Sequence, residues 1–167
     1  LAPHQISRIL VFFDPYSDRT GAGWHVIQSM IAIGSGGLFG KGLLQGTQAQ
    51  LNFLPAHHTD FVFSVVGEEL GFLGSFFLLV MYLLLLWRGL KIMTLAKDDF
   101  GANLAAGVSA MILFHLVINI GMTLGVMPVT GIPLPFISYG GSSLLTNMAG
   151  IGLLLNVHMR RRKIMFQ

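Results

Sequence analysis

The fold of this chain is decided by the run Leu70-Gly-Phe-Leu-Gly-Ser-Phe-Phe-Leu-Leu-Val-Met-Tyr-Leu-Leu-Leu-Leu-Trp87, which contains no Asp, Glu, Lys or Arg. At about 1.5 Å of rise per helical residue, this run nearly crosses the roughly 30 Å hydrocarbon core of a bilayer. Of the whole chain, 53% is hydrophobic and only 10% is charged, and its mean hydropathy is +0.71. Such a composition excludes an ordinary water-soluble domain and predicts a membrane protein.

Two further segments have the same character, because no Asp, Glu, Lys or Arg occurs between Gly101 and Met159. We therefore expect an all-α, polytopic membrane protein with three transmembrane helices, at residues 61–90, 102–127 and 137–158. A large extracytoplasmic loop region with short helices is expected at residues 1–60. A proline-rich extracytoplasmic connection at 128–136 and a basic cytoplasmic tail at 159–167 complete the expected organisation.

The basic residues predict how the chain is oriented. Seven of the ten follow the first or the third expected span, namely Arg88, Lys91, Lys97, Arg160, Arg161, Arg162 and Lys163. Because Lys and Arg are enriched on the cytoplasmic side of membranes, residues 1–60 and 128–136 are expected on the outer face. An outer segment followed by three spans requires another helix upstream, so we expect N-terminal helices of the same protein as partners.

Composition also excludes several kinds of function. The formal net charge of +3 is small, so nucleic acid is not an expected partner. The absence of cysteine excludes disulfides, cysteine nucleophiles and zinc sites with cysteine ligands.

Asp60 is the strongest candidate for chemistry. Thr59 is expected to cap a helix that has Asp60 in its first turn, and capping alone would account for both residues. Asp60, Ser64, Gly67 and Gly71 also recur at helical spacing, which makes a face of small residues suited to close helix contact. Asp60 should then point into a bundle or cavity, where an ionised carboxylate could accept a proton from a substrate hydroxyl.

Other polar residues within the expected spans favour structural roles. Glu68 and Glu69 lie deeper along the same helix, where a carboxylate is costly unless it is paired or hydrated. In the second span, His115, Asn119 and Thr123 share one face, and such groups usually form hydrogen bonds between helices. We therefore expect Glu68, Glu69 and Asn119 to give polar support to the bundle.

The histidines before Asp60 invite a metal-site interpretation, which the spacing does not favour. His57 and His58 are adjacent and would point apart on an extended segment, and no H-E-x-x-H pattern occurs. No metal site is therefore expected from protein ligands alone.

Three prolines and several glycines prevent regular helical hydrogen bonding in residues 128–143, so this backbone must face protein or a hydrated cavity. We expect it to form a rigid wall of an outward-facing site.

Several long motifs carry a resemblance to a known family, the bacterial shape, elongation, division and sporulation proteins. They are Gly36-Gly-Leu-Phe-Gly-Lys-Gly42, His58-Thr-Asp-Phe61, Gly67-Glu-Glu-Leu-Gly71 and Pro128-Val-Thr-Gly-Ile-Pro-Leu-Pro-Phe-Ile-Ser-Tyr-Gly-Gly-Ser-Ser143. The match extends from Asp14-Pro15 to the basic tail. The segment Asn119-Ile-Gly-Met122, followed by Leu124-Gly-Val, resembles the rod-shape branch more than the division branch.

This resemblance implies a ten-helix glycosyltransferase of the bacterial inner membrane that polymerises lipid II together with a class B penicillin-binding protein. Asp60 would match the family's essential aspartate, which deprotonates the acceptor sugar hydroxyl. Departure of undecaprenyl pyrophosphate would need positive charge, for which the candidates are Lys41, Arg8 and Arg19, or a divalent cation such as Mg²⁺ or Mn²⁺. The remaining candidates for substrate binding are His58, Ser138, Ser142 and Ser143.

Two other classes of function remain open at this stage. Polar residues within the spans and unwound outer backbone are also typical of transporters, so the protein could translocate a lipid-linked precursor. It could instead be a non-catalytic membrane scaffold for a transpeptidase, in which case the packing glycines would matter and Asp60 would not.

Overall fold

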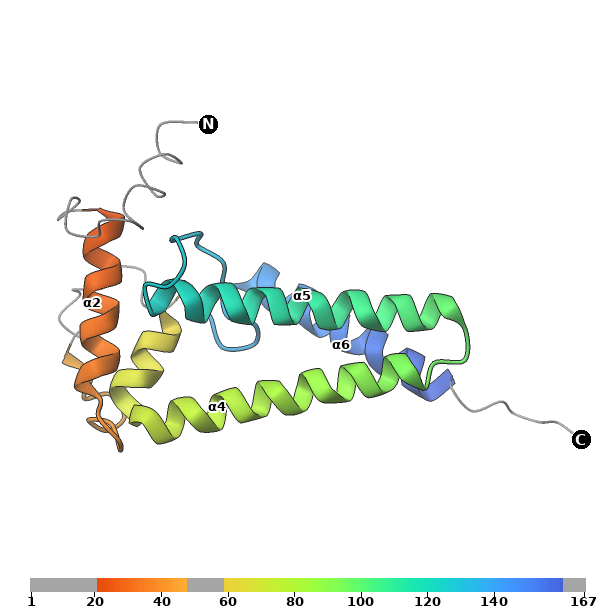
Figure 1. Ribbon diagram of the computed structural model, residues 1–167, viewed down its shortest axis with the longest axis horizontal. Helices are drawn as coiled ribbons and strands as arrows, with labels where there is room; N and C mark the ends of the chain where they lie inside the picture. Colours follow the sequence, from red (N-terminus) through yellow and green to blue (C-terminus); the bar gives the residue numbers. More distant parts are fainter. Residues whose placement is uncertain (1–20, 48–58, 161–167) are drawn as a thin grey trace, which may run out of the picture.

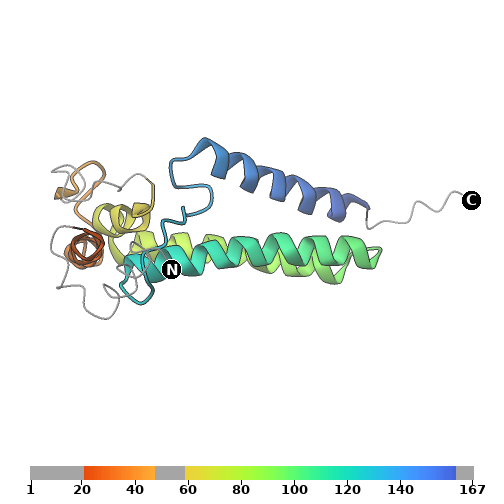
Figure 2. The ribbon, with the colours of Figure 1, turned by 90° about the horizontal axis from the view of Figure 1, so that it is seen from above.

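The computed structural model describes residues 21–47 and 59–160, and these include four helices: α2 (Ala22–Ser35), α4 (Val62–Thr94), α5 (Asp99–Thr123) and α6 (Gly141–Arg160). No strand occurs in those two ranges, so the all-α expectation is confirmed for them. Helices α4 and α5 lie side by side and run antiparallel, while α2 lies crosswise at the end where α4 begins (Figure 1). Helix α6 packs mainly on α5 and converges on it toward its own C-terminal end (Figure 2).

The helix bounds differ from the expected spans at several ends. Helix α5 stops at Thr123 instead of 127, because the amides of Val126 and Met127 turn back to the carbonyl of Gly121, at 2.8 and 3.1 Å. Helix α6 begins at Gly141 instead of 137, because Phe136 has a positive φ of 67° and a turn closes between Ser138 and Leu134. The irregular connection is therefore longer than the 128–136 that we expected.

Among the described helices, α4 and α5 are long and apolar enough to cross a membrane. Helix α6 has 20 residues, but Ser, Thr, Asn and His side chains make it more polar, so its crossing stays a prediction. The surface fits a membrane setting, because large apolar side chains such as Phe77 and Leu83 of α4 are 65% and 66% exposed. A surface of this kind is suited to contact with lipid or with other helices.

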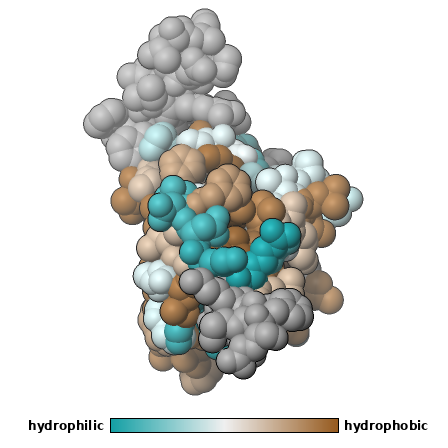
Figure 3. Space-filling model, turned by 90° about the vertical axis from the view of Figure 1, so that its right-hand side faces the viewer, coloured by the Kyte–Doolittle hydropathy of each residue, from teal (hydrophilic) through white to brown (hydrophobic). Residues whose placement is uncertain are grey.

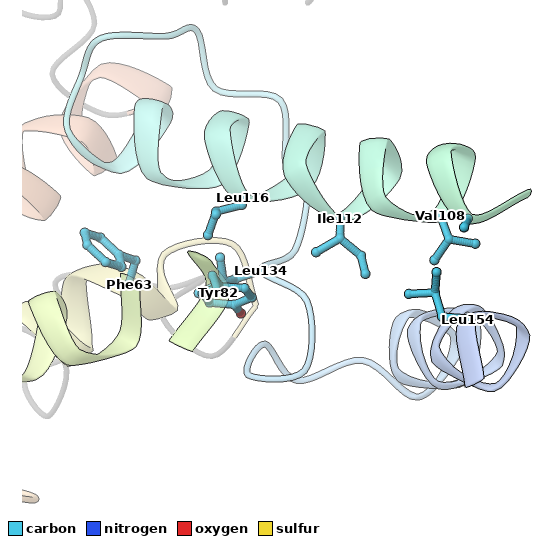
Figure 4. Packing of buried hydrophobic residues seen from close by; sticks show 8 residues of the cluster. Phe63, Tyr82, Val108, Ile112, Leu116, Leu134 and Leu154 are labelled. Carbon is cyan, nitrogen blue, oxygen red and sulfur yellow. The ribbon is translucent and has the colours of Figure 1, made fainter. Parts of the chain in front are cut away.

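The buried core joins the three long helices to the proline-rich connection (Figure 4). Toward the end of the bundle where α2 lies, Phe63 and Tyr82 of α4 meet Leu134 of the connection, and the Tyr82 hydroxyl donates a hydrogen bond to the carbonyl of Pro135. Toward the other end, the core continues between α5 and Leu154 of α6. The connection is thus packed into the bundle, which is what unwound backbone at membrane depth requires.

Helix α4 is interrupted at Gly71, which has φ 67° and ψ −161°. This conformation is essentially restricted to glycine, because any Cβ would meet neighbouring backbone. The interruption divides α4 into an outer arm, which we define as residues 62–70, and a long inner part that continues to Thr94. The outer arm turns sharply out of the line of the inner part and runs beside α2 (Figure 1).

The interruption at Gly71 is filled by the loop of residues 36–42, which we call the glycine loop. In an unbroken helix, the amides of Phe72 and Leu73 would donate to the carbonyls of Glu68 and Glu69. Instead, these amides donate to the carbonyls of Gly37 and Leu38, at 2.9 and 3.1 Å. The freed carbonyls of Glu68 and Glu69 accept from the amides of Lys41 and Gly42, at 3.0 and 3.1 Å. Four hydrogen bonds to the loop therefore replace two within the helix.

Glycines allow the close approach that these hydrogen bonds need. A Cβ on Gly36 would overlap the carbonyl oxygen of Gly67, and one on Gly40 would overlap that of Glu69. Gly67 packs against Ile33 of α2, which is the close helix contact expected of the small-residue face, whereas Gly71 brings loop backbone against helix backbone.

We predict that Gly71→Ala destabilises the full-length protein by at least about 2 kcal/mol, because the new methyl group would clash with the glycine loop and strain the backbone. The matched control is Gly107→Ala in α5, where nothing lies within 4 Å of a new Cβ and φ is not positive. The midpoint of thermal unfolding in detergent would fall for Gly71→Ala and stay level or rise for Gly107→Ala. Equal midpoints for the two variants would contradict the interruption at Gly71.

Candidate active site

Asp60 lies in the turn immediately before α4, at the end of the bundle where α2 also lies (Figure 1). The prediction that Thr59 caps the helix and puts Asp60 in its first turn is wrong. Helix α4 begins at Val62, its N-cap residue is Phe61, and no side chain caps it. The reason is that Phe61 has a non-helical conformation, with φ −107° and ψ 25°, so Asp60 stays outside the helix.

The side chain that follows Asp60 anchors this turn. Phe61 is only 2% exposed, and it packs with Ala32 of α2 and with Val129 of the proline-rich connection. Its ring also lies near that of His25, with 6.3 Å between the centroids. Burial of a phenylalanine contributes about 1.5–3 kcal/mol, so the backbone beside Asp60 is held in place by packing.

Asn119 of α5 holds the backbone of Asp60 directly. Its amide nitrogen Nδ2 donates to the carbonyl of Asp60 at 2.9 Å and to the carbonyl of Ile132 at 2.8 Å. Asn119 is fully buried, and its Oδ1 has no hydrogen-bond partner among the described residues. One side chain thus ties the turn before α4, helix α5 and the proline-rich connection together.

The carboxylate of Asp60 faces the proline-rich connection at Gly131. A Cβ on Gly131 would lie 3.3 Å from Oδ2 of Asp60, and Gly131 has a φ of 75°, which favours glycine. Asp60 is half-buried. Within the described ranges, its carboxylate makes no hydrogen bond or ion pair, so its oxygens remain available to a ligand.

Lys41 and Glu68 form an ion pair at the glycine loop. Nζ of Lys41 lies 2.7 Å from Oε1 of Glu68, and the two side chains are 29% and 1% exposed. The same oxygen accepts from the amide and the hydroxyl of Thr47, at 2.8 and 3.0 Å, and Nζ of Lys41 donates to that hydroxyl at 2.9 Å. Glu68 therefore organises polar groups of the loop, and Lys41 already has an anionic partner.

The role of Lys41 in substrate binding stays a prediction, as does the support expected from Glu69. Glu69 is half-buried, and within the described ranges its carboxylate has no hydrogen-bond partner. It contributes through its backbone, because its carbonyl accepts a hydrogen bond from the amide of Gly42.

The candidate serines lie beyond the proline-rich connection and have different surroundings. The hydroxyl of Ser138 accepts a hydrogen bond from the amide of Leu134 at 2.8 Å, so it closes a turn. Ser143 lies 3.3 Å from Nδ2 of Asn147, and Ser142 is exposed. No hydrogen bond in the described ranges joins any of these serines to Asp60, and His58 lies outside the described residues.

Metal binding has little support from the residues that the structure describes. No group of three or more His, Asp or Glu side chains comes together there in a way that could hold an ion. A single carboxylate such as that of Asp60 does not make a protein metal site.

A buried hydroxyl pair joins α2 to the outer arm, and sequence reasoning missed its first member. The hydroxyls of Ser29 and Ser64 lie 2.6 Å apart, and Ser29 also donates to the carbonyl of Thr123 at 2.6 Å. Since Ser29 has one proton, Ser64 is the donor to Ser29. The only sequence signal for Ser29 is its position as a small polar residue within the mostly apolar stretch 26–33 of α2, while Ser64 belonged to the small-residue face noted above.

The arrangement as a whole is suited to proton transfer. It presents one carboxylate on a fixed backbone, close to Gly131 of the proline-rich connection, and its oxygens have no partner among the described residues. A general base needs this kind of access to the proton that it removes.

Comparisons with known proteins agree with the motifs. A family model described as "Cell cycle protein", which covers FtsW, RodA and SpoVE, matches residues 1–163. The peptidoglycan glycosyltransferase MrdB of Escherichia coli K12 is 50% identical over 96% of this chain and 44% of its own length. The peptidoglycan glycosyltransferase RodA of Treponema pallidum is 51% identical over 96% of this chain and 37% of its own length.

A solved structure has the same fold. It comes from work entitled "Structural coordination of polymerization and crosslinking by a peptidoglycan synthase complex" and aligns with a TM-score of 0.74 at 42% identity. The alignment covers 98% of this chain and 44% of that one. The chain thus spans less than half the length of the relatives that it matches here.

We predict that Asn119→Leu destabilises the full-length protein by about 1–3 kcal/mol, because it leaves two buried carbonyls without a donor. The control is Asn103→Leu, which changes an exposed residue of the same helix. Thermal unfolding would separate the two variants. An unchanged midpoint for Asn119→Leu would show that the bonds to Asp60 and Ile132 contribute nothing to stability.

The Lys41–Glu68 pair makes a separate prediction. Lys41→Met should cost about 3–5 kcal/mol, because it leaves the buried carboxylate of Glu68 without its counter-charge. Adding Glu68→Gln removes that charge, keeps an acceptor for Thr47 and should restore most of the unfolding midpoint. If the double variant also regains catalytic activity, Lys41 acts through the pair; if it regains stability but not activity, Lys41 has a role at the substrate.

Proposed function

Because the chain belongs to the family of cell cycle proteins that comprises FtsW, RodA and SpoVE, we propose that it is the C-terminal part of a RodA-like peptidoglycan glycosyltransferase. Its substrate would be lipid II, and its role would be cell elongation and the maintenance of cell shape. Support comes from relatives named peptidoglycan glycosyltransferases, which are 50% and 51% identical to this chain. The remaining helices of the enzyme would come from the part of the protein upstream of this chain.

In the proposed reaction, Asp60 accepts the proton of the acceptor sugar hydroxyl. The oxygen of that hydroxyl forms a new bond to the anomeric carbon of the donor. The bond between that carbon and the pyrophosphate oxygen breaks, and the electron pair leaves with undecaprenyl pyrophosphate. A positioned base typically contributes about 10²–10⁴-fold to the rate of such a step.

One observation carries the assignment of the base. Asp60 is the carboxylate whose backbone is tied to α5 and to the proline-rich connection, while its own oxygens have no partner in the described ranges. Glu68, by contrast, is fully buried and already accepts hydrogen bonds from Lys41 and Thr47.

Stabilisation of the leaving group is a further part of the proposal. Lys41 would have to exchange its contact with Glu68 for one with pyrophosphate, while His58, Ser138, Ser142 and Ser143 would bind other parts of the substrate. A divalent cation such as Mg²⁺ or Mn²⁺ would have to be held largely by the pyrophosphate itself, because the described residues do not form a metal site. No step of the reaction is therefore assigned to a metal.

The setting that we propose is the bacterial inner membrane, with Asp60 on the extracytoplasmic side. Arg88 and Lys91 lie near the C-terminal end of α4 and Lys97 follows it, which supports a cytoplasmic position for that end. A class B penicillin-binding protein would be the crosslinking partner. That partnership is supported by the similar solved structure, whose title describes a complex that coordinates polymerization and crosslinking.

Asp60→Asn in the full-length protein with its partner should lower the rate of glycan polymerisation by at least about 100-fold, because the amide cannot accept the proton. Gel separation of products from labelled lipid II measures this rate. The unfolding midpoint should stay unchanged, since the carboxylate makes no contact that the amide would lose in the described ranges.

The matched control is Asp99→Asn, which changes an exposed carboxylate at the start of α5. It should leave polymerisation unchanged. Full polymer yield from Asp60→Asn would contradict the proposed base. If the wild-type protein flips lipid II in liposomes but makes no polymer, a transporter is favoured. If Asp60→Asn and Asp99→Asn both support cell growth and shape as well as the wild-type protein does, a scaffold is favoured.

A further inference from the structure

A cavity lies at the end of the molecule opposite Asp60, between the C-terminal parts of α4 and α6. Its volume is about 360 Å³, and it is lined by Arg88, Lys91, Ile92, Leu155 and His158. Figure 3 views this end of the molecule and shows hydrophilic residues gathered around a hydrophobic depression. Nothing in the proposed glycosyl transfer uses this cavity.

In the part of the chain that the structure describes, neither of the two cations that line the cavity has a carboxylate partner. Arg88 and Lys91 are exposed, and the only ion pair among the described residues is the distant one between Lys41 and Glu68. Both cations gather at one aromatic ring, because Cζ of Arg88 and Nζ of Lys91 lie 5.8 and 5.4 Å from the centre of the Trp87 ring. Two like charges held at one ring make a site that favours an anion.

The rest of the cavity is apolar. Ile92 and Leu155 contribute hydrocarbon walls, and the stems of Arg88 and Lys91 add more, since long cationic side chains bury their methylene groups and keep the charge at the rim. Trp87 is 54% exposed at the end of the apolar run, which is where tryptophans collect at a membrane surface. An apolar wall beside a cationic rim matches a ligand with a hydrocarbon chain and an anionic headgroup.

We propose that this cavity binds an anionic glycerophospholipid. Its phosphodiester would lie against the guanidinium of Arg88 and the ammonium of Lys91, and an acyl chain would follow Ile92 and Leu155. Basic pockets between transmembrane helices recognise anionic lipid headgroups by these contacts. A free phosphate would satisfy the two cations but would leave the apolar walls unused, so the cavity is matched to the whole lipid.

The test uses delipidated full-length protein in detergent, titrated with phosphatidylglycerol or phosphatidylcholine of the same acyl chains and followed by native mass spectrometry. The wild-type protein should bind phosphatidylglycerol more tightly. The double variant Arg88→Gln/Lys91→Gln should weaken that binding by roughly 30-fold. The matched control is Lys97→Gln, which removes a cation from the same end of the molecule but outside this cavity.

A second variant tests the apolar wall without touching charge. Leu155→Trp places a larger ring where the acyl chain would lie, so it should weaken phosphatidylglycerol binding while all the cations remain. Thermal unfolding of each variant would check that the fold is kept. Glycerol 1-phosphate, a phosphate monoester without acyl chains, should not compete at the concentrations where phosphatidylglycerol binds.

Several outcomes would overturn the proposal. Equal losses for Arg88→Gln/Lys91→Gln and Lys97→Gln would mean that general surface charge binds the lipid. Competition by glycerol 1-phosphate would mean that the ligand is a phosphate compound without chains. No preference for phosphatidylglycerol and no effect of either cavity variant would mean that another part of the full-length protein fills the space.

Discussion

The structure depends on four backbone hydrogen bonds between the glycine loop and the interrupted helix α4. Unpaired amides and carbonyls cannot persist at membrane depth, since each would cost several kcal/mol. The interruption at Gly71 leaves two amides and two carbonyls of α4 without partners inside the helix. The loop supplies the partners, which are the carbonyls of Gly37 and Leu38 and the amides of Lys41 and Gly42. The loop and the interruption therefore exist only together, which gives a physical reason why two glycine-rich motifs, far apart in the sequence, occur in the same chain.

The interruption matters because Asp60 lies in the turn immediately before the outer arm of α4. Since the arm runs beside α2, Ser64 can meet Ser29, and Phe61 can pack with Ala32. Asn119 then completes the arrangement from α5 by donating to the carbonyl of Asp60. The position of the carboxylate is thus determined by its neighbours in the backbone, while its own oxygens are left for a ligand.

Much of the fold could be predicted from the sequence, because its main signal is the apolar run that ends at Trp87. The all-α architecture of the described residues followed from composition and periodicity alone. The start of α4 was predicted wrongly, because Thr59 and Asp60 have typical capping chemistry and only the burial of Phe61 reveals that the helix begins later. The hydrogen bonds across Gly71 had no local signal, since a glycine within an apolar run is equally consistent with close helix packing.

The candidate site was predictable to a similar degree. Asp60 stood out because it is a carboxylate near the end of an expected membrane-spanning helix. A charged group there raises the free energy unless it is paired, hydrated or functional. The partner of Lys41 was not predictable, because the ion pair with Glu68 joins residues that only the folded glycine loop brings together. The role of Asn119 was expected to be polar support, yet its bonds go to backbone carbonyls rather than to side chains of other helices, and periodicity cannot distinguish the two.

The most direct test of this account is amide hydrogen exchange in the full-length protein, resolved for residues 36–42 and 68–73. We predict that the amides of Lys41, Gly42, Phe72 and Leu73 exchange slowly and at similar rates, because all four belong to one set of hydrogen bonds between the glycine loop and α4. Fast exchange at Lys41 and Gly42 together with slow exchange at Phe72 and Leu73 would show that α4 closes its own interruption. That result would contradict the account.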